Sequence, residues 1–138
     1  MKLIFDTNIW VSYFISKSFD EILEILNNDY FNVIFSEELI GEIRIVLERP
    51  KFQRVINKTH IKDIINLIIS RCSFYYPEIE LELCRDQKDD FLLKLCEVSN
   101  ADYLITGDND LLVLGNYKST KILKWSNFIT ILKEYKLL

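Results

Sequence analysis

The chain has 138 residues, of which 49% are apolar and 13% aromatic, with three glycines, two prolines and a formal net charge of −4. This length and composition exclude a disordered chain and predict one domain, residues 1–138. The apolar runs are much shorter than the roughly 18 to 20 residues that span a bilayer. Asp6 also lies too early for the apolar region of a secretory signal, so we expect a cytoplasmic protein.

Apolar spacing along the chain predicts strands that alternate with helices. Ser36 is a suitable N-cap for the third helix, Pro50 marks its end, and Ser126 is the expected cap of the last helix. In chain order we expect a strand at 2–5, helices at 8–15 and 19–26, a strand at 31–35, helices at 37–47 and 59–70, a strand at 73–76, an acidic loop at 78–89, a helix at 90–98, a strand at 103–106, a helix at 111–114, a strand at 121–123 and a helix at 126–137.

Short, almost wholly apolar strands that alternate with helices are typical of a parallel sheet covered on both faces. The sequence therefore predicts an α/β fold of three layers, with a central, mainly parallel sheet of about five strands between helices. In open sheets of this kind, ligands bind at the carboxyl ends of the strands, where loops and helix starts meet. We therefore expect the functional residues at that edge.

Acidic residues follow successive predicted strands. Asp6 comes directly after the first strand, Glu42 lies on the helix after the second, and Asp108 follows the fourth. Asp89 and Asp90 open the helix that comes after the third. Each acid alone has an ordinary structural explanation, such as a helix N-cap, a solvated helix position or a Gly-Asp turn. The presence of an acid after each of these successive strands instead predicts that the acids form one common site.

Carboxylates that lie within about 4 to 6 Å of one another repel by a few kcal/mol per pair at an effective dielectric near 20. Either some of them are protonated or a divalent cation lies among them. Oxygen ligands, in a chain whose only histidine is His60, favour Mg²⁺ or Mn²⁺ over Zn²⁺. Such an ion polarises a phosphoryl oxygen and activates a water molecule, so that phosphodiester cleavage needs no protein nucleophile.

Four short motifs resemble those of PIN-domain ribonucleases, and the resemblance covers essentially the whole chain. Two further stretches, Arg49-Pro50-Lys51-Phe52 and residues 121–128, are similar to the branch of that family described as toxins of toxin–antitoxin modules. Gln87 departs from the pattern, because a proline is common there. The four motifs are Asp6-Thr7-Asn8, residues 36–43 around Glu42, residues 85–92 around Asp89, and residues 103–112 around Asp108.

The resemblance implies a Mg²⁺- or Mn²⁺-dependent endoribonuclease that cleaves single-stranded RNA, often as a homodimer, and in many members held inactive by a small antitoxin protein. Asp6, Glu42 and Asp89 would be the core metal ligands and Asp108 the fourth acid, with Asp90 as the alternative to Asp89. The polar residues expected to support these acids are Thr7, Asn8, Thr106 and Asp110.

Basic residues gather in a stretch without acids that could bind RNA phosphates, although such a run is as often a solvated surface. Trp10 and Trp125 are expected in the core or an interface, and Trp125 beside Lys124 could alternatively stack on a base. The three cysteines match neither a disulfide framework nor a CxxC metal site. The four basic residues predicted to bind RNA are Arg49, Lys51, Arg54 and Lys58.

Two other functions are compatible with the sequence. One is a PIN-fold module that binds RNA without cleaving it, although an inactive version is expected to have lost some of the four acids. The other is a phosphatase similar to the haloacid dehalogenases, or a phospho-receiver domain, in which Asp6 would accept a phosphoryl group. The phosphatase requires a second aspartate where this chain has Asn8, and a late lysine for which there is no clear candidate.

Overall fold

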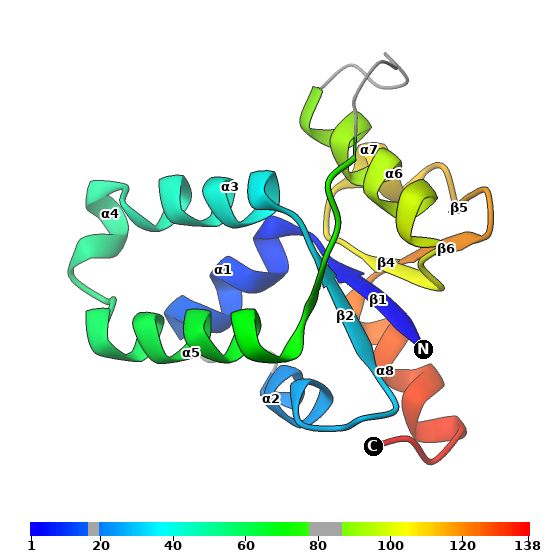
Figure 1. Ribbon diagram of the computed structural model, residues 1–138, viewed down its shortest axis with the longest axis horizontal. Coiled ribbons are helices and arrows are strands. Elements are labelled where there is room, and N and C mark those ends of the chain that lie inside the picture. Colours follow the sequence, from blue (N-terminus) through cyan, green and yellow to red (C-terminus); the bar gives the residue numbers. More distant parts are fainter. Residues whose placement is uncertain (17–19, 78–86) are drawn as a thin grey trace.

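The computed structural model describes residues 1–16, 20–77 and 87–138 (Figure 1). Its strands form a six-stranded sheet in the order β3-β2-β1-β4-β6-β5. All neighbouring strands are parallel except β5, which pairs antiparallel with β6. The strands are β1 (Lys2–Phe5), β2 (Asn32–Phe35), β3 (Ser73–Phe74), β4 (Tyr103–Ile105), β5 (Asn116–Tyr117) and β6 (Thr120–Leu123).

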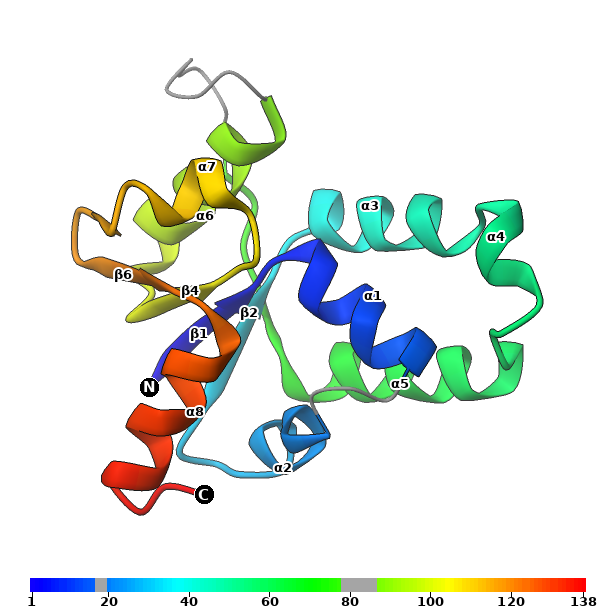
Figure 2. The ribbon, with the colours of Figure 1, turned by 180° about the vertical axis from the view of Figure 1, so that it is seen from behind.

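Helices cover both faces of the sheet and extend beyond one side of it. Figure 1 shows α6 in front of the sheet, and the reverse view in Figure 2 shows α8 in front of it, with α1 beside the strands between α3 and α5. The helices are α1 (Thr7–Ser16), α2 (Glu21–Leu26), α3 (Glu37–Leu47), α4 (Pro50–Gln53), α5 (Lys58–Arg71), α6 (Gln87–Ser99), α7 (Asn109–Leu112) and α8 (Trp125–Glu134).

Helices α3, α4 and α5 form a U-shaped arm to one side of the sheet (Figures 1 and 2). The arm begins at Ser36, whose buried hydroxyl accepts a hydrogen bond from the Leu39 amide at 3.2 Å and caps α3 as predicted. Pro50 occupies the first turn of α4, where its missing N–H leaves no hydrogen bond unmade. The chain therefore turns after α3 and returns along α5.

The apolar strand residues form the centre of the core. Leu3, Ile4 and Phe5 of β1 have no exposed surface, because β1 lies in the middle of the sheet with helices on both faces. Phe5 contacts the rings of Trp10, Phe128 and Trp125 at centroid distances of 5.6, 6.1 and 5.9 Å. This aromatic cluster fixes α1 and α8 against the strand that ends at Asp6.

The predicted fold class is confirmed, while several element boundaries were wrong. The antiparallel strand β5 and the short helix α4 were not predicted, and β3 ends at Phe74, before Tyr76. Lys124 is the N-cap residue of α8, so Ser126 is not its cap. Helix α6 begins at Gln87, which brings Asp89 into its first turn. The rest of the predicted acidic loop, residues 78–86 with Cys84, lies outside the described residues.

Within the described residues, no helix is both long enough and apolar enough to cross a membrane.

Candidate metal centre

Asp6 is the first acid after β1, and its carboxylate is completely buried. Its Oδ1 accepts a hydrogen bond from the Thr7 amide at 2.6 Å. Its Oδ2 accepts one from the Thr106 hydroxyl at 2.7 Å and a longer one from the Asn8 side-chain amide at 3.4 Å. A buried carboxylate is costly unless it is hydrogen-bonded, and these donors both satisfy Asp6 and fix its orientation.

Thr106 joins the first acid to the fourth. While its hydroxyl donates to Asp6, the same oxygen accepts a hydrogen bond from the Asp108 amide at 3.0 Å. A second link crosses beside it, since the Gly107 amide donates to Asn8 Oδ1 at 3.3 Å. Because β1 and β4 are neighbouring parallel strands, the residues that follow them meet at the same edge of the sheet.

Glu42 reaches the same edge from the arm. Its carboxylate Oε2 accepts a hydrogen bond from the Thr7 hydroxyl at 2.5 Å. Thr7 begins α1 and is buried, so its amide holds Asp6 while its hydroxyl holds Glu42. The second acidic motif is thus connected to the first through one threonine.

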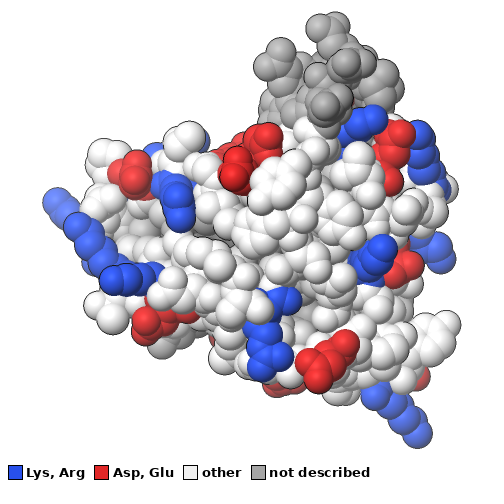
Figure 3. All heavy atoms as spheres, in the orientation of Figure 1, with Lys and Arg blue, Asp and Glu red and all other residues white. Residues whose placement is uncertain are grey.

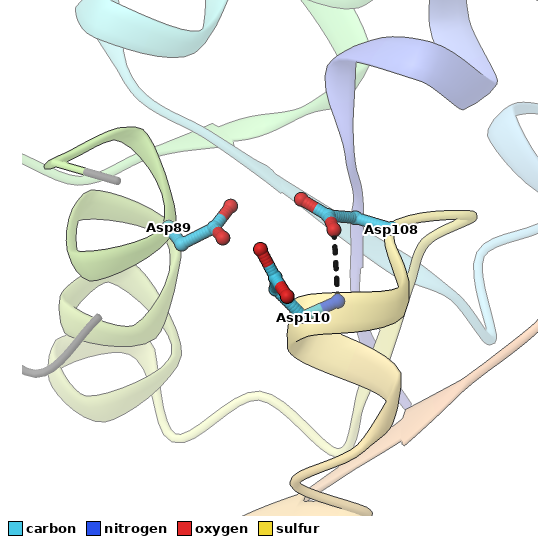
Figure 4. Close-up of side chains that lie close together, drawn as sticks. All are labelled: Asp89, Asp108 and Asp110. Carbon is cyan, nitrogen blue, oxygen red and sulfur yellow. Dashed lines mark hydrogen bonds between the residues drawn. The ribbon is translucent and has the colours of Figure 1, made fainter. Parts of the chain in front are cut away.

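Three carboxylates converge beside this network. One ligand oxygen from each of Asp89, Asp108 and Asp110 lies within 4.8 Å of the others. Figure 4 shows Asp89 projecting from α6 toward Asp108 and Asp110 at the start of α7, where the Asp110 amide donates to Asp108 Oδ1 at 2.9 Å. Asp89 is buried, Asp108 half-buried and Asp110 exposed, so the cluster opens toward solvent.

The chemistry of these donors fits a hard divalent cation. At an effective dielectric near 20, two unit charges at this separation repel by about 3 kcal/mol, and a cation between them would reverse the sign. The ligand atoms are carboxylate oxygens, which Mg²⁺ and Mn²⁺ prefer. His60, the only histidine in the chain, lies in the first turn of α5 on the arm and is not a member of this group.

The structure brings together a different set of acids from the predicted core ligands. Asp6 and Glu42 stand outside the group of three, although the two threonines link them to it. The two competing acids in α6 are both buried, and Asp89 rather than Asp90 converges with the others. Asp110, predicted only to support the site, supplies the third carboxylate. The sequence could have indicated this role, because Asp110 follows Asp108, the N-cap residue of α7, by two positions. Both side chains then point past the start of the helix.

Helix α6, which carries Asp89, is attached at its other end to the β5–β6 hairpin. Glu97 accepts a hydrogen bond from Lys118 Nζ at 2.7 Å and lies 3.5 Å from Lys94 Nζ. The Lys118 hydrogen bond lowers the pKa of Glu97, and the same contact raises the pKa of Lys118. These groups are partly exposed, so the pair mainly fixes the direction of α6 relative to the strands.

The predicted RNA-binding cations lie away from the acids. Lys51 lies in α4, Arg49 and Arg54 flank that helix, and Lys58 begins α5, so all four are at the far end of the arm (Figure 3), and all four are exposed. Helix α3, with 11 residues and a length of about 16 Å, separates them from the acidic edge. The space-filling view also shows acidic side chains over the N-terminal part of α3. The four cations are Arg49, Lys51, Arg54 and Lys58.

Two comparisons with known proteins found a match, one in fold and one in family. A chain in the crystal structure of VapBC2 from Rickettsia felis, bound to a DNA fragment from their promoter, is similar in fold, with a TM-score of 0.60 and 12% sequence identity. The similarity covers 91% of this chain and 99% of that one. A search of curated proteins found no match. The PIN domain family matches residues 2–110, which include all the acids described above. The chain therefore belongs to the PIN domain family, whose members are nucleases that use divalent metal ions.

Proposed function

We propose that this protein is an endoribonuclease that cleaves single-stranded RNA with the help of Mg²⁺ or Mn²⁺. The observation that carries the proposal is the convergence of Asp89, Asp108 and Asp110 beside the buried Asp6. Acids from separate connections meet at one edge of the sheet, at a mutual distance that favours a bound cation. Family membership supplies the reaction class, hydrolysis of a phosphodiester bond.

In this proposal the three converging carboxylates hold the ion, and Asp6 and Glu42 complete its surroundings. When bound, the ion supplies the positive charge that polarises a phosphoryl oxygen and lowers the pKa of a water molecule. Thr7 and Thr106 are buried and are assigned a supporting role. They orient the carboxylates of Glu42 and Asp6 through their hydroxyl groups, as outer residues commonly do around metal sites.

The exposed cations of the arm are the proposed contacts for RNA phosphates. Such contacts hold the nucleic acid without reading its sequence. Neutralising Arg49, Lys51, Arg54 and Lys58 together should therefore weaken binding of all RNA sequences alike. For single strands, each lost phosphate contact should also reduce the slope of log affinity against log salt by about 0.7.

We further propose that the chain acts as one domain in the cytoplasm, as a homodimer and as the toxin of a toxin–antitoxin module. The motif resemblance to the toxin branch supports this role, and the structural neighbour from Rickettsia felis is part of a VapBC2 assembly. A small protein encoded beside this gene should then copurify with the chain and suppress cleavage. Sedimentation analysis of the purified chain tests the homodimer.

Cleavage of labelled single-stranded RNA tests the proposed reaction. The wild-type protein should cut RNA in Mn²⁺ and stop when EDTA is added, and Asp6→Asn should slow cutting by about 10- to 100-fold. Asp63→Asn is the matched control, because Asp63 is an exposed acid on α5, away from the acidic edge. Equal rates for wild type and Asp6→Asn, or RNA binding without any cleavage, would show that the nuclease proposal is wrong.

A further inference from the structure

A pocket of about 390 Å³ lies at the end of the sheet opposite to the acidic cluster. The acids follow the carboxyl ends of parallel strands, whereas this pocket is formed where β1, β2, β4 and β6 begin. In Figure 1 the letter N marks this end of β1. The volume is in the range of pockets that bind small molecules. The lining residues are Met1, Tyr30, Asp102, Tyr103, Ser119 and Lys121.

Tyr103 and Lys121 form one wall of the pocket. They are register partners in the neighbouring parallel strands β4 and β6, so their side chains leave the same face of the sheet. The ring of Tyr103 lies 5.8 Å from that of the fully buried Phe128 in α8, measured between centroids. This contact holds the phenol ring in place, and the lysine stands next to it.

Asp102 is fixed beside this wall although it is exposed. Its carbonyl accepts a hydrogen bond from the Lys121 amide at 3.0 Å, and its amide donates to the Lys2 carbonyl at 2.9 Å. Its carboxylate Oδ2 accepts a hydrogen bond from the Lys2 amide at 2.7 Å. Among the described residues no donor reaches the second oxygen, Oδ1, which can therefore accept from a ligand.

The other polar groups of the pocket are not used by the fold. Within the part of the chain that the structure describes, four of them form no hydrogen bond or ion pair. One cation, one carboxylate oxygen and three hydroxyl groups are thus available to a ligand in one pocket. The four groups are the phenols of Tyr30 and Tyr103, the hydroxyl of Ser119 and the ammonium of Lys121.

This combination of groups suits a nucleotide. A lysine binds phosphate as a point charge, and a fixed carboxylate accepts hydrogen bonds from ribose hydroxyls. Tyr30 is 52% exposed, and the edge contact of its ring with Phe31 at 5.3 Å keeps it in place. Both tyrosine rings line the pocket, so part of each is open to an aromatic ligand. A bare phosphate suits the pocket less well, because Asp102 would repel it.

We propose that this amino-end pocket binds a nucleoside monophosphate, either free or as the terminal nucleotide of an RNA. Lys121 pairs with the phosphate, Asp102 accepts hydrogen bonds from the ribose, and Tyr30 and Tyr103 contact the base. The three residues of β4 span about 10 Å, so the ligand lies away from the acids. The inference goes beyond the proposed function and does not depend on it, because none of the metal-binding acids lines the pocket.

Calorimetric titration of the full chain with adenosine monophosphate (AMP) in EDTA tests the pocket without metal or cleavage. A ligand of about 23 non-hydrogen atoms should bind an open pocket with a Kd of about 10 µM to 1 mM. Lys121→Met should weaken binding by about 10- to 100-fold, as expected for loss of a hydrogen bond to a charged group. The matched control is Lys124→Met, because Lys124 is an exposed lysine at the other end of β6 and should leave the Kd unchanged.

Two results of this titration would overturn the proposal. One is an equal Kd for the wild type and Lys121→Met, and the other is no binding of AMP at millimolar concentration. Inorganic phosphate and adenosine provide the ligand controls, and each should bind at least about 10-fold more weakly than AMP. Inorganic phosphate that binds as tightly as AMP would indicate an adventitious anion only and would also overturn the proposal.

Amide chemical shifts locate the ligand on the protein. AMP should shift the amide signals of Tyr103 and Lys121 and leave that of Asp108 unchanged, and the reverse pattern would overturn the proposal. Competition then distinguishes the two sources of the nucleotide. Displacement of AMP by an oligonucleotide with a terminal phosphate would support the RNA end as the ligand, and lack of displacement would support the free nucleotide.

Discussion

Replacing Asp108 with asparagine should have opposite effects on stability in the absence and presence of metal. Asparagine caps helices as well as aspartate does, so the hydrogen bond from the Asp110 amide is retained and only the charge is lost. In EDTA the variant should be more stable than the wild type, because the repulsion within the acidic cluster is reduced. In Mn²⁺ it should be less stable, because a ligand charge has been removed.

The size of the effect follows from the geometry. Asp108 has two carboxylate neighbours within 4.8 Å, and each pair repels by about 3 kcal/mol at an effective dielectric near 20. Asp110 is exposed and Asp108 only half-buried, so water and salt reduce the total to about 1 kcal/mol. For a chain of this length that is a rise of about 3 to 4 °C in Tm in EDTA. With Mn²⁺ at 100 times its Kd, the wild type should gain about 2.7 kcal/mol.

Thermal unfolding of both proteins in EDTA and in Mn²⁺ measures these changes. Asp63→Asn, which removes an exposed charge on α5, should change stability equally in the two buffers. The reasoning fails if Asp108→Asn is destabilised by the same amount with and without metal. It also fails if Mn²⁺ leaves the Tm of the wild type unchanged.

Three further predictions concern residues around the cluster. Thr106→Val removes a buried hydroxyl that both donates and accepts a hydrogen bond. It should lower the free energy of unfolding, measured in urea, by about 1 to 3 kcal/mol and weaken Mn²⁺ binding. Thr106→Ser keeps the hydroxyl and should restore both the stability and the Mn²⁺ affinity. Burial raises the pKa of Cys96 to about 12, and its side chain is buried, so with the other two cysteines changed to serine, the native protein at pH 8 should react with a disulfide reagent only as fast as the fold opens. The hydrogen bond from Lys118 lowers the pKa of Glu97, so this pair stabilises the fold above the ordinary glutamate pKa of 4.5 and ceases to do so as the pH falls through the lowered value. Glu97→Gln should therefore flatten the acid side of the stability profile, and an unchanged profile would refute the assignment.

The arrangement of the acids could be predicted because it depends on regular features of the chain. Short apolar strands that alternate with helices imply a parallel sheet, and such a sheet brings the residues after its strands to one edge. Asp6 and Asp108 follow neighbouring strands, so their proximity required no knowledge of side-chain detail. The cap at Ser36 followed from a residue preference that acts locally.

The composition of the converging group could not be predicted, because it depends on where short elements begin. Helix α6 starts at Gln87, earlier than predicted, so Asp89 lies in its first turn and not in a loop. From that turn Asp89 reaches the cluster. Asp110 joins the group because it lies in the first turn of the helix that Asp108 caps. That helix has only four residues and is too short to leave a periodic pattern in the sequence. The two residues of β5 form a strand only through their pairing with β6, which the sequence does not reveal. Tertiary contacts, not local preference, set these boundaries.

Anomalous diffraction from crystals grown with Mn²⁺ tests the central claim most directly, since it locates the metal without relying on activity. The account predicts a manganese peak within ligand distance of the carboxylates of Asp89, Asp108 and Asp110, and loss of that peak in Asp108→Asn. A peak elsewhere on the protein, or ordered acids with no manganese among them at saturating concentration, would contradict it.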